Sequence, residues 1–209
     1  LSNYIWNERL SRHFTNVMKS LRPESLVVVG GPNIPFEKER QGEFFQNWDN
    51  LDVYALGEGD FLATEIVNRF LDAGKSVAKL VKSGVPSSVY RLDGQVVHGS
   101  PWGRNLDLEK SASPWLGGAQ DHFFDGKLIP MIETNRGCPF SCSFCADGQA
   151  SKNKIYRFDS QRTKEELHYI AKRVKNMSEL MIVDLNFGMY KQDMTTGKMI
   201  MDIQRIYNY

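Results

Sequence analysis

The chain has 209 residues, of which 41% are hydrophobic and 24% charged, and its formal net charge is +1. These proportions are ordinary for a globular protein, and the balanced charge argues against a nucleic-acid or membrane partner. No apolar run approaches the roughly 18 residues of a membrane helix, and we expect no signal peptide. All three cysteines lie within eight residues of one another, which favours a metal site in a reducing cytoplasm over a disulfide framework.

The first 82 residues predict alternating helices and strands. Apolar residues recur at helical spacing over 8–21, and a continuous apolar run at 26–32, ended by glycines, is typical of a strand in a parallel sheet. Residues 51–56 predict the next strand, and Asp60 is expected to cap the helix that follows, which ends near Gly74. This alternation predicts a doubly wound α/β domain.

The pattern changes after residue 82. Residues 88–91 and 95–98 flank a Leu-Asp-Gly turn and predict a β-hairpin. Residues 99–128 are rich in glycine, proline, serine and charge, which indicates an irregular linker.

Regular structure is predicted again from residue 129. A strand over 129–133 precedes the cysteines, and a capping box at 163–166 is expected to begin a helix that runs to residue 177. A second buried-type strand at 180–183 and a helix over 196–207 follow. The sequence therefore predicts a second βαβα run.

The cysteines Cys138, Cys142 and Cys145 have the spacing C-x3-C-x2-C. Thiolates suit zinc or iron–sulfur clusters, but a structural zinc site normally has four ligands. Zinc would need a distant or missing fourth ligand, and a bland alternative is three buried apolar cysteines. A cubane held by three thiolates would leave one iron open to a small molecule.

The run from Arg136 to Cys145 resembles the cluster loop of radical S-adenosylmethionine (SAM) enzymes. The resemblance implies a [4Fe-4S] cluster on the three cysteines, whose open iron chelates SAM and cleaves it to methionine and a 5′-deoxyadenosyl radical. Phe144 matches the adenine-packing position. Asp184 and Asn186, in a run similar to one that ends the second strand of related proteins, are expected to face the methionyl group or the substrate.

Residues 2–7, 29–32 and 56–60 resemble parts of the cobalamin-binding domain that precedes many radical SAM barrels. The resemblance implies that Ser2, Gly30 and Gly31 line the slot for the nucleotide tail. Gly57 and Gly59 would shape the neighbouring loop.

Together these features predict an α/β chain in three parts. They are a partial, Rossmann-like cobalamin-binding domain at 1–82, a hairpin and linker at 83–128, and the first βα units of a partial TIM-type radical SAM barrel at 129–209. Both ends are expected to be truncated.

The expected function is radical SAM chemistry, with cobalamin-dependent methyl transfer to an unactivated carbon of a small-molecule substrate. A reducing partner such as flavodoxin or ferredoxin would supply the electron. The alternatives are a radical SAM enzyme without methyl transfer and a non-catalytic iron–sulfur or zinc-binding module.

Overall fold

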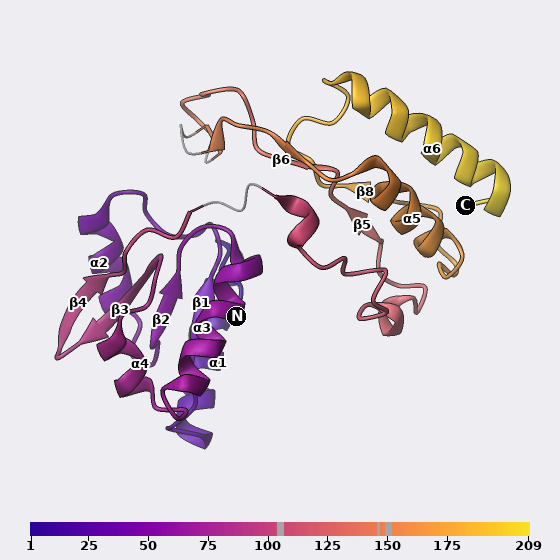
Figure 1. The fold of residues 1–209 in the computed structure, drawn as a ribbon. Coiled ribbons are helices and arrows are strands. Elements are labelled where there is room, and N and C mark those ends of the chain that lie inside the picture. Colours follow the sequence, from indigo (N-terminus) through magenta and orange to yellow (C-terminus); the bar gives the residue numbers. More distant parts are fainter. Residues whose placement is uncertain (104–106, 146, 149–151) are drawn as a thin grey trace. The chain divides into compact units, whose positions relative to one another are not determined.

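The computed structural model describes residues 1–103, 107–145, 147–148 and 152–209, so part of the predicted linker, residues 104–106, lies outside the described residues. The chain forms two compact units, Leu1–Asn105 and Leu106–Tyr209, coloured indigo to magenta and magenta to yellow in Figure 1. Each unit has its own strands and helices.

The N-terminal unit is built on a four-stranded sheet of order β1-β2-β3-β4. Its strands are β1 (Val28–Gly30), β2 (Val53–Ala55), β3 (Ser88–Leu92) and β4 (Gln95–His98). β1 and β2 run parallel, β3 and β4 continue the sheet antiparallel, and Ser2 forms a parallel bridge to Gly30 beside β1. The predicted mixture of parallel strands and helices is therefore present.

The predicted hairpin is confirmed as β3 and β4. Its two turn residues, Asp93 and Gly94, have φ of 49° and 79°, as a type I′ turn requires. Because β3 pairs with β2, the hairpin belongs to the sheet of the N-terminal unit, where the sequence suggested a separate connecting segment.

Four helices cover the two faces of this sheet: α1 (Glu8–Leu21), α2 (Lys38–Gln46), α3 (Gly59–Asp72) and α4 (Val77–Ser83). Alternation along the strands separates two apolar clusters. One packs Val29 and Tyr54 against Phe45 and Trp48 at α2, and the other packs Val53 against α3 and α4. This unit is thus a mixed α/β fold with helices on both faces of a sheet that contains one parallel pair.

The helix predicted over residues 8–21 is confirmed as α1, whereas the prediction that Asp60 caps the helix after β2 is wrong. The apolar residues of α1 do recur at helical spacing, but Leu10, Phe14 and Leu21 are exposed, and Ser11 and Thr15 are the residues that α1 buries. Asp60 does not cap α3, because that helix begins at Gly59 after Glu58, which makes no side-chain capping bond.

The C-terminal unit has two small sheets and two main helices. β5 (Met131–Ile132) pairs in parallel with β8 (Met181–Ile182), and β6 (Asn135–Arg136) pairs antiparallel with β7 (Tyr156–Arg157). The helices α5 (Ser160–Ala171) and α6 (Lys191–Tyr207) pack side by side (Figure 1). Two short 3-10 helices, η1 (Leu108–Lys110) and η2 (Asp121–Phe123), precede β5. The buried apolar residues between β5, α5 and α6 are Ile132, Leu167, Ala171 and Ile203.

The predicted start of α5 was wrong by one turn. Asp159 is the N-cap and accepts a hydrogen bond from the Gln161 amide at 2.7 Å, whereas the Thr163 hydroxyl donates to the Asp159 carbonyl. α6 also begins earlier than predicted, at Lys191. Among the described residues no helix is long and apolar enough to cross a membrane.

Candidate functional site

The cysteine loop leaves β6 and returns through β7. Asn135 pairs with Arg157 and Arg136 with Tyr156, so the ladder closes the loop at its base. Two further amides continue the closure on either side: Phe158 N–H donates to the Thr134 carbonyl at 3.0 Å, and Cys138 N–H donates to the Lys152 carbonyl at 3.0 Å. The first cysteine is therefore fixed by the backbone on which the loop closes.

Gly137 lets the two limbs of the loop approach closely. It is buried, its φ is +112°, and an added Cβ would lie 2.2 Å from the Lys154 carbonyl oxygen. Real Cβ atoms do not come that near to backbone oxygen, so a side chain here would push the limbs apart. Glycine directly before Cys138 is thus a requirement of the loop's geometry.

The three cysteines are free thiols on this loop, with Cys138 half-buried and Cys142 and Cys145 exposed. The Cys145 amide donates to the Cys142 carbonyl at 3.1 Å, and the Asp147 amide lies 3.4 Å from the Cys145 sulfur as a donor. One backbone amide is therefore directed at a cysteine sulfur of the loop.

Cofactors are not part of the computed structure, and within its described residues no three Cys, His, Asp or Glu side chains converge into a metal-holding group. The donor set nevertheless fits an iron–sulfur cluster, because the loop offers three soft thiols and an amide aimed at one of them. Phe144, the predicted adenine contact, is 91% exposed.

Asp184 follows β8 and accepts four hydrogen bonds from the residues that lead into the cysteine loop. Its Oδ1 accepts from the Thr134 amide at 2.6 Å and the Asn135 amide at 3.2 Å. Its Oδ2 accepts from the Thr134 hydroxyl and from Asn135 Nδ2, the latter at 2.7 Å. This carboxylate is directed at Thr134 and Asn135, and its contact with SAM or substrate stays a prediction.

Asn186 is placed differently from Asp184. Its Nδ2 is buried and has no hydrogen-bond partner among the residues that the structure describes. An unpaired buried donor is costly unless a further group satisfies it. Of the two residues predicted to face the ligand, Asn186 is the one with hydrogen-bonding capacity to offer.

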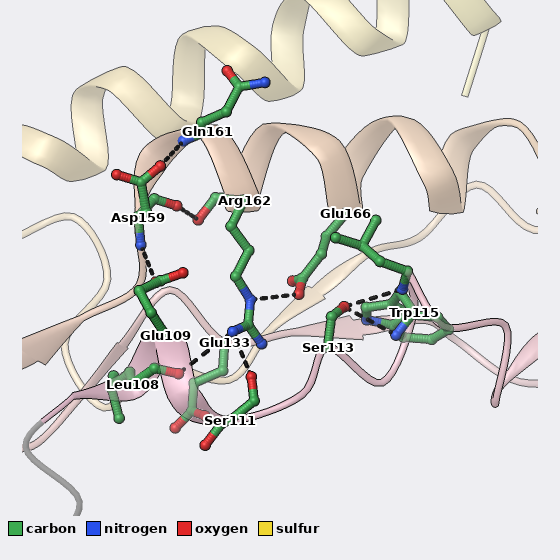
Figure 2. A network of polar contacts seen from close by, with 12 residues as sticks. Leu108, Glu109, Ser111, Ser113, Trp115, Glu133, Asp159, Gln161, Arg162 and Glu166 are labelled. Atoms are coloured by element: carbon green, nitrogen blue, oxygen red, sulfur yellow. Dashed lines mark hydrogen bonds and ion pairs between the residues drawn. The ribbon is translucent and has the colours of Figure 1, made fainter.

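Arg162 of α5 holds the segment before β5 against the base of the loop (Figure 2). It pairs with the buried Glu166 at 3.1 Å and donates to the Ser111 carbonyl at 2.6 Å and the Leu108 carbonyl at 3.4 Å. Its guanidinium also lies 4.5 Å from the ring centre of Phe158, next to β7. These contacts join residues 108–111, α5 and the returning limb of the loop.

In the N-terminal unit, the predicted cobalamin residues gather at the carboxyl ends of parallel strands. Ser2 is in lateral register with Gly30, and Gly30 with Ala55, so three small residues stand in one row across the sheet. Gly57 and Gly59 follow the end of β2. Apart from adjacent residues and the backbone of α3, no described atom lies within 4 Å of the position a Cβ would take at either. Parallel α/β sheets bind ligands at this edge.

The backbone at position 31 requires glycine, for a reason that the sequence did not reveal. Its φ is +122°, and an added Cβ would lie 2.4 Å from the Asn3 carbonyl oxygen. The buried Asn3 side chain donates to the Asn33 carbonyl at 3.0 Å and to the Tyr54 hydroxyl at 3.2 Å, and that hydroxyl donates to the Gly31 carbonyl at 3.1 Å. Gly31 is therefore packed against the chain itself.

Burial raises the pKa of Tyr54 to about 12, and the nearby carboxylate of Glu8 acts in the same direction. The hydroxyl thus stays protonated at neutral pH and keeps its hydrogen bonds with Asn3 and Gly31, next to Ser2. Four residues with such supporting roles were not predicted from the sequence: Tyr54, Thr134, Asn135 and Asp193. Their roles depend on neighbours about 50 residues away or on a tertiary contact. Polar residues directly next to predicted site motifs are the signal that was available.

A scan against models of protein families finds no match. Among curated proteins, the chain is 31% identical over 208 residues to the 2-(S-pantetheinyl)-carbapenam-3-carboxylate methyltransferase of Streptantibioticus cattleyicolor, covering 97% of this chain and 29% of that protein. It is 33% identical over 201 residues to the cobalamin-dependent radical SAM methyltransferase TokK of Streptomyces tokunonensis, covering 93% of this chain and 28% of TokK. The chain thus spans less than a third of the length of these relatives.

Solved structures share the fold. The cobalamin-dependent SAM radical enzyme OxsB, with aqua-cobalamin bound, matches with a TM-score of 0.66 at 19% identity over 98% of this chain and 28% of OxsB. The radical SAM methyltransferase TsrM from Kitasatospora setae, with cobalamin and a [4Fe-4S] cluster bound, matches with a TM-score of 0.57 at 15% identity over 95% of this chain and 37% of TsrM.

Proposed function

We propose that this chain supplies the cluster loop and part of the corrinoid site of a cobalamin-dependent radical SAM methyltransferase. The premise is that the chain is homologous to a segment of these enzymes. The observation that carries the proposal is the C-x3-C-x2-C loop, which holds all three cysteines of the chain and is closed at its base directly after β5.

Cys138, Cys142 and Cys145 are the proposed ligands of the cluster. A [4Fe-4S] cluster bound there supplies one electron, delivered by a carrier such as flavodoxin or ferredoxin, for the reductive cleavage of SAM. The chain's own contribution is to hold the loop: the ladder at its base and the Cys138–Lys152 backbone bond fix the first ligand.

Asn186 is the proposed polar contact for SAM next to the loop. Its unpartnered Nδ2 is a donor, and the methionyl carboxylate of SAM is an acceptor of matching chemistry. Phe144 is proposed to pack on the adenine, since its ring is exposed on the same loop between Ser143 and Cys145.

The row formed by Ser2, Gly30 and Ala55, with Gly57 and Gly59 beyond it, is the proposed edge of the corrinoid site. Small residues in register leave room above the sheet, and the open surroundings of Gly57 and Gly59 let a ligand approach the backbone. The parallel pair β5 and β8, joined through α5, is proposed to be the start of a partial barrel.

The reaction is tested by anaerobic reconstitution of the protein, reduction and measurement of 5′-deoxyadenosine released from SAM. The proposal predicts SAM-dependent release that is lost in Cys142→Ala. A reconstituted protein that binds zinc, or holds a cluster without cleaving SAM, would instead support a non-catalytic metal module.

The corrinoid site is tested separately by absorption spectra after incubation with hydroxocobalamin. Gly59→Leu should weaken binding strongly, because the side chain would fill space that is open in the protein alone. Gly197→Leu is the matched control, since its surroundings in α6 are equally open and lie in the other unit. SAM cleavage with no corrinoid bound would favour a radical SAM enzyme that transfers no methyl group.

A further inference from the structure

The segment that follows β8 contacts both limbs of the cysteine loop. The incoming limb is held at Asp184, whose two carboxylate oxygens accept four hydrogen bonds from Thr134 and Asn135. Thr134 is 8% exposed and Asn135 1%, so these bonds are shielded from water. Only two residues separate Asn135 from Cys138, the first proposed ligand.

The outgoing limb meets the same segment at Asp193, whose carboxylate is buried. Its Oδ2 accepts from the amides of Gly188 at 2.9 Å and Tyr190 at 2.8 Å, which shapes the turn between β8 and α6. Its Oδ1 lies 3.9 Å from the guanidinium of Arg157 in β7, and that guanidinium lies 4.3 Å from the centre of the Tyr190 ring.

We infer that residues 184–193 position the cysteine loop, with Asp184 fixing the limb that enters it and Asp193 the limb that leaves it. Asp184 is thereby a positioning residue that acts on the cluster through Thr134 and Asn135. This inference rests on the proposed function, because it gives the loop its purpose as a cluster-binding loop.

The arrangement requires a carboxylate at position 184, because both of its oxygens must accept hydrogen bonds. Four donors converge on two oxygens, and a carboxylate accepts at both, whereas a carboxamide replaces one acceptor with a donor. In Asp184→Asn the new amide would meet Asn135 Nδ2, which now lies 2.7 Å from Oδ2. Asn135→Asp would supply an acceptor at that place, so the double variant restores a donor–acceptor pair that each single variant breaks.

The first measurement is made without a cluster, by hydrogen exchange of the backbone amides of Gly137 and Cys138. Loss of the Asp184 bonds should speed exchange there by about tenfold, and the double variant Asp184→Asn/Asn135→Asp should recover most of the protection. Asp193→Asn should instead raise exchange at residues 156–158, in the outgoing limb.

The second measurement is the electron paramagnetic resonance spectrum and midpoint potential of the reduced, reconstituted cluster. Asp184→Asn should shift both, and the double variant should bring both back towards the wild-type values. Tyr207→Phe is the matched control, because it removes a hydroxyl that lies 3.1 Å from His168 Nδ1 and joins α6 to α5 in the same unit. It should lower thermal stability and leave the cluster spectrum unchanged.

The outcomes separate the two claims. A wild-type protein that assembles no cluster would overturn the proposed function and this inference with it. A wild-type cluster whose spectrum, potential and loop exchange are the same in Asp184→Asn would overturn the inference alone. Equal spectral shifts in Asp184→Asn and Tyr207→Phe would also overturn it, because the effect would then be general destabilisation.

Discussion

Gly137→Ala is the substitution whose effect on the cysteine loop follows most directly from the structure. The new Cβ would lie 2.2 Å from the Lys154 carbonyl oxygen and 3.1 Å from that of Lys152. An alanine at φ +112° carries a backbone penalty of about 1–2 kcal/mol, and loss of the Cys138–Lys152 hydrogen bond adds about 1 kcal/mol. Together they lower the free energy of unfolding of the C-terminal unit by about 2–3 kcal/mol.

The assay is thermal unfolding of the cluster-free protein, followed by iron and sulfide analysis after reconstitution. For a unit of this size each kcal/mol lowers the melting temperature by roughly 4–8 °C, so we expect a fall of about 10 °C or more and poor cluster assembly. Gly197→Ala is the control: it lies inside α6 with open surroundings, and alanine should stabilise the helix by up to about 1 kcal/mol. A Gly137→Ala protein with wild-type melting and a full cluster would refute the close approach of the two limbs.

Two further predictions concern the supports of the two sites. Because burial raises the pKa of Tyr54 to about 12, the folded protein keeps a proton that the unfolded chain releases above pH 10. Tyr54 therefore contributes stability that is full below pH 10 and lost as pH rises through 12. In urea unfolding, the free energy of unfolding of Tyr54→Phe should fall less steeply over that range than that of the wild-type protein. An equally steep fall would contradict the assignment. Arg162→Ala should leave Glu166 buried without its ion-pair partner and cost about 3 kcal/mol, with faster hydrogen exchange at residues 108–111. Arg162→Lys should recover part of the stability. If residues 108–111 keep their protection from exchange in Arg162→Ala, Arg162 does not hold this segment.

The sequence predicted those features that depend on local chemistry. The hairpin followed from Asp93-Gly94, because few residue pairs accept two positive φ angles in succession. The buried strands followed from continuous apolar runs, and β1 and β2 indeed lie parallel.

Features set by distant neighbours were missed or misread. The apolar face of α1 is exposed because Ser11 and Thr15 face inward, where the Ser11 hydroxyl donates to the Ser2 carbonyl. The hydrogen bonds that Asp184 accepts from Thr134 and Asn135 were missed, since sequence spacing does not show that residues about 50 positions apart meet. Helix starts shifted by up to a turn, as at Asp159, because several polar residues in succession are able to cap.

The central claim, that Cys138, Cys142 and Cys145 hold a cluster that binds SAM, is tested most directly by electron paramagnetic resonance of the anaerobically reconstituted and reduced protein, recorded with and without SAM. We predict the signal of one [4Fe-4S] cluster, about four irons and four sulfides per chain, whose g values change when SAM is added. Each single Cys→Ala variant should lose that signal. Full retention of the cluster in the variant that lacks all three thiols would contradict the account.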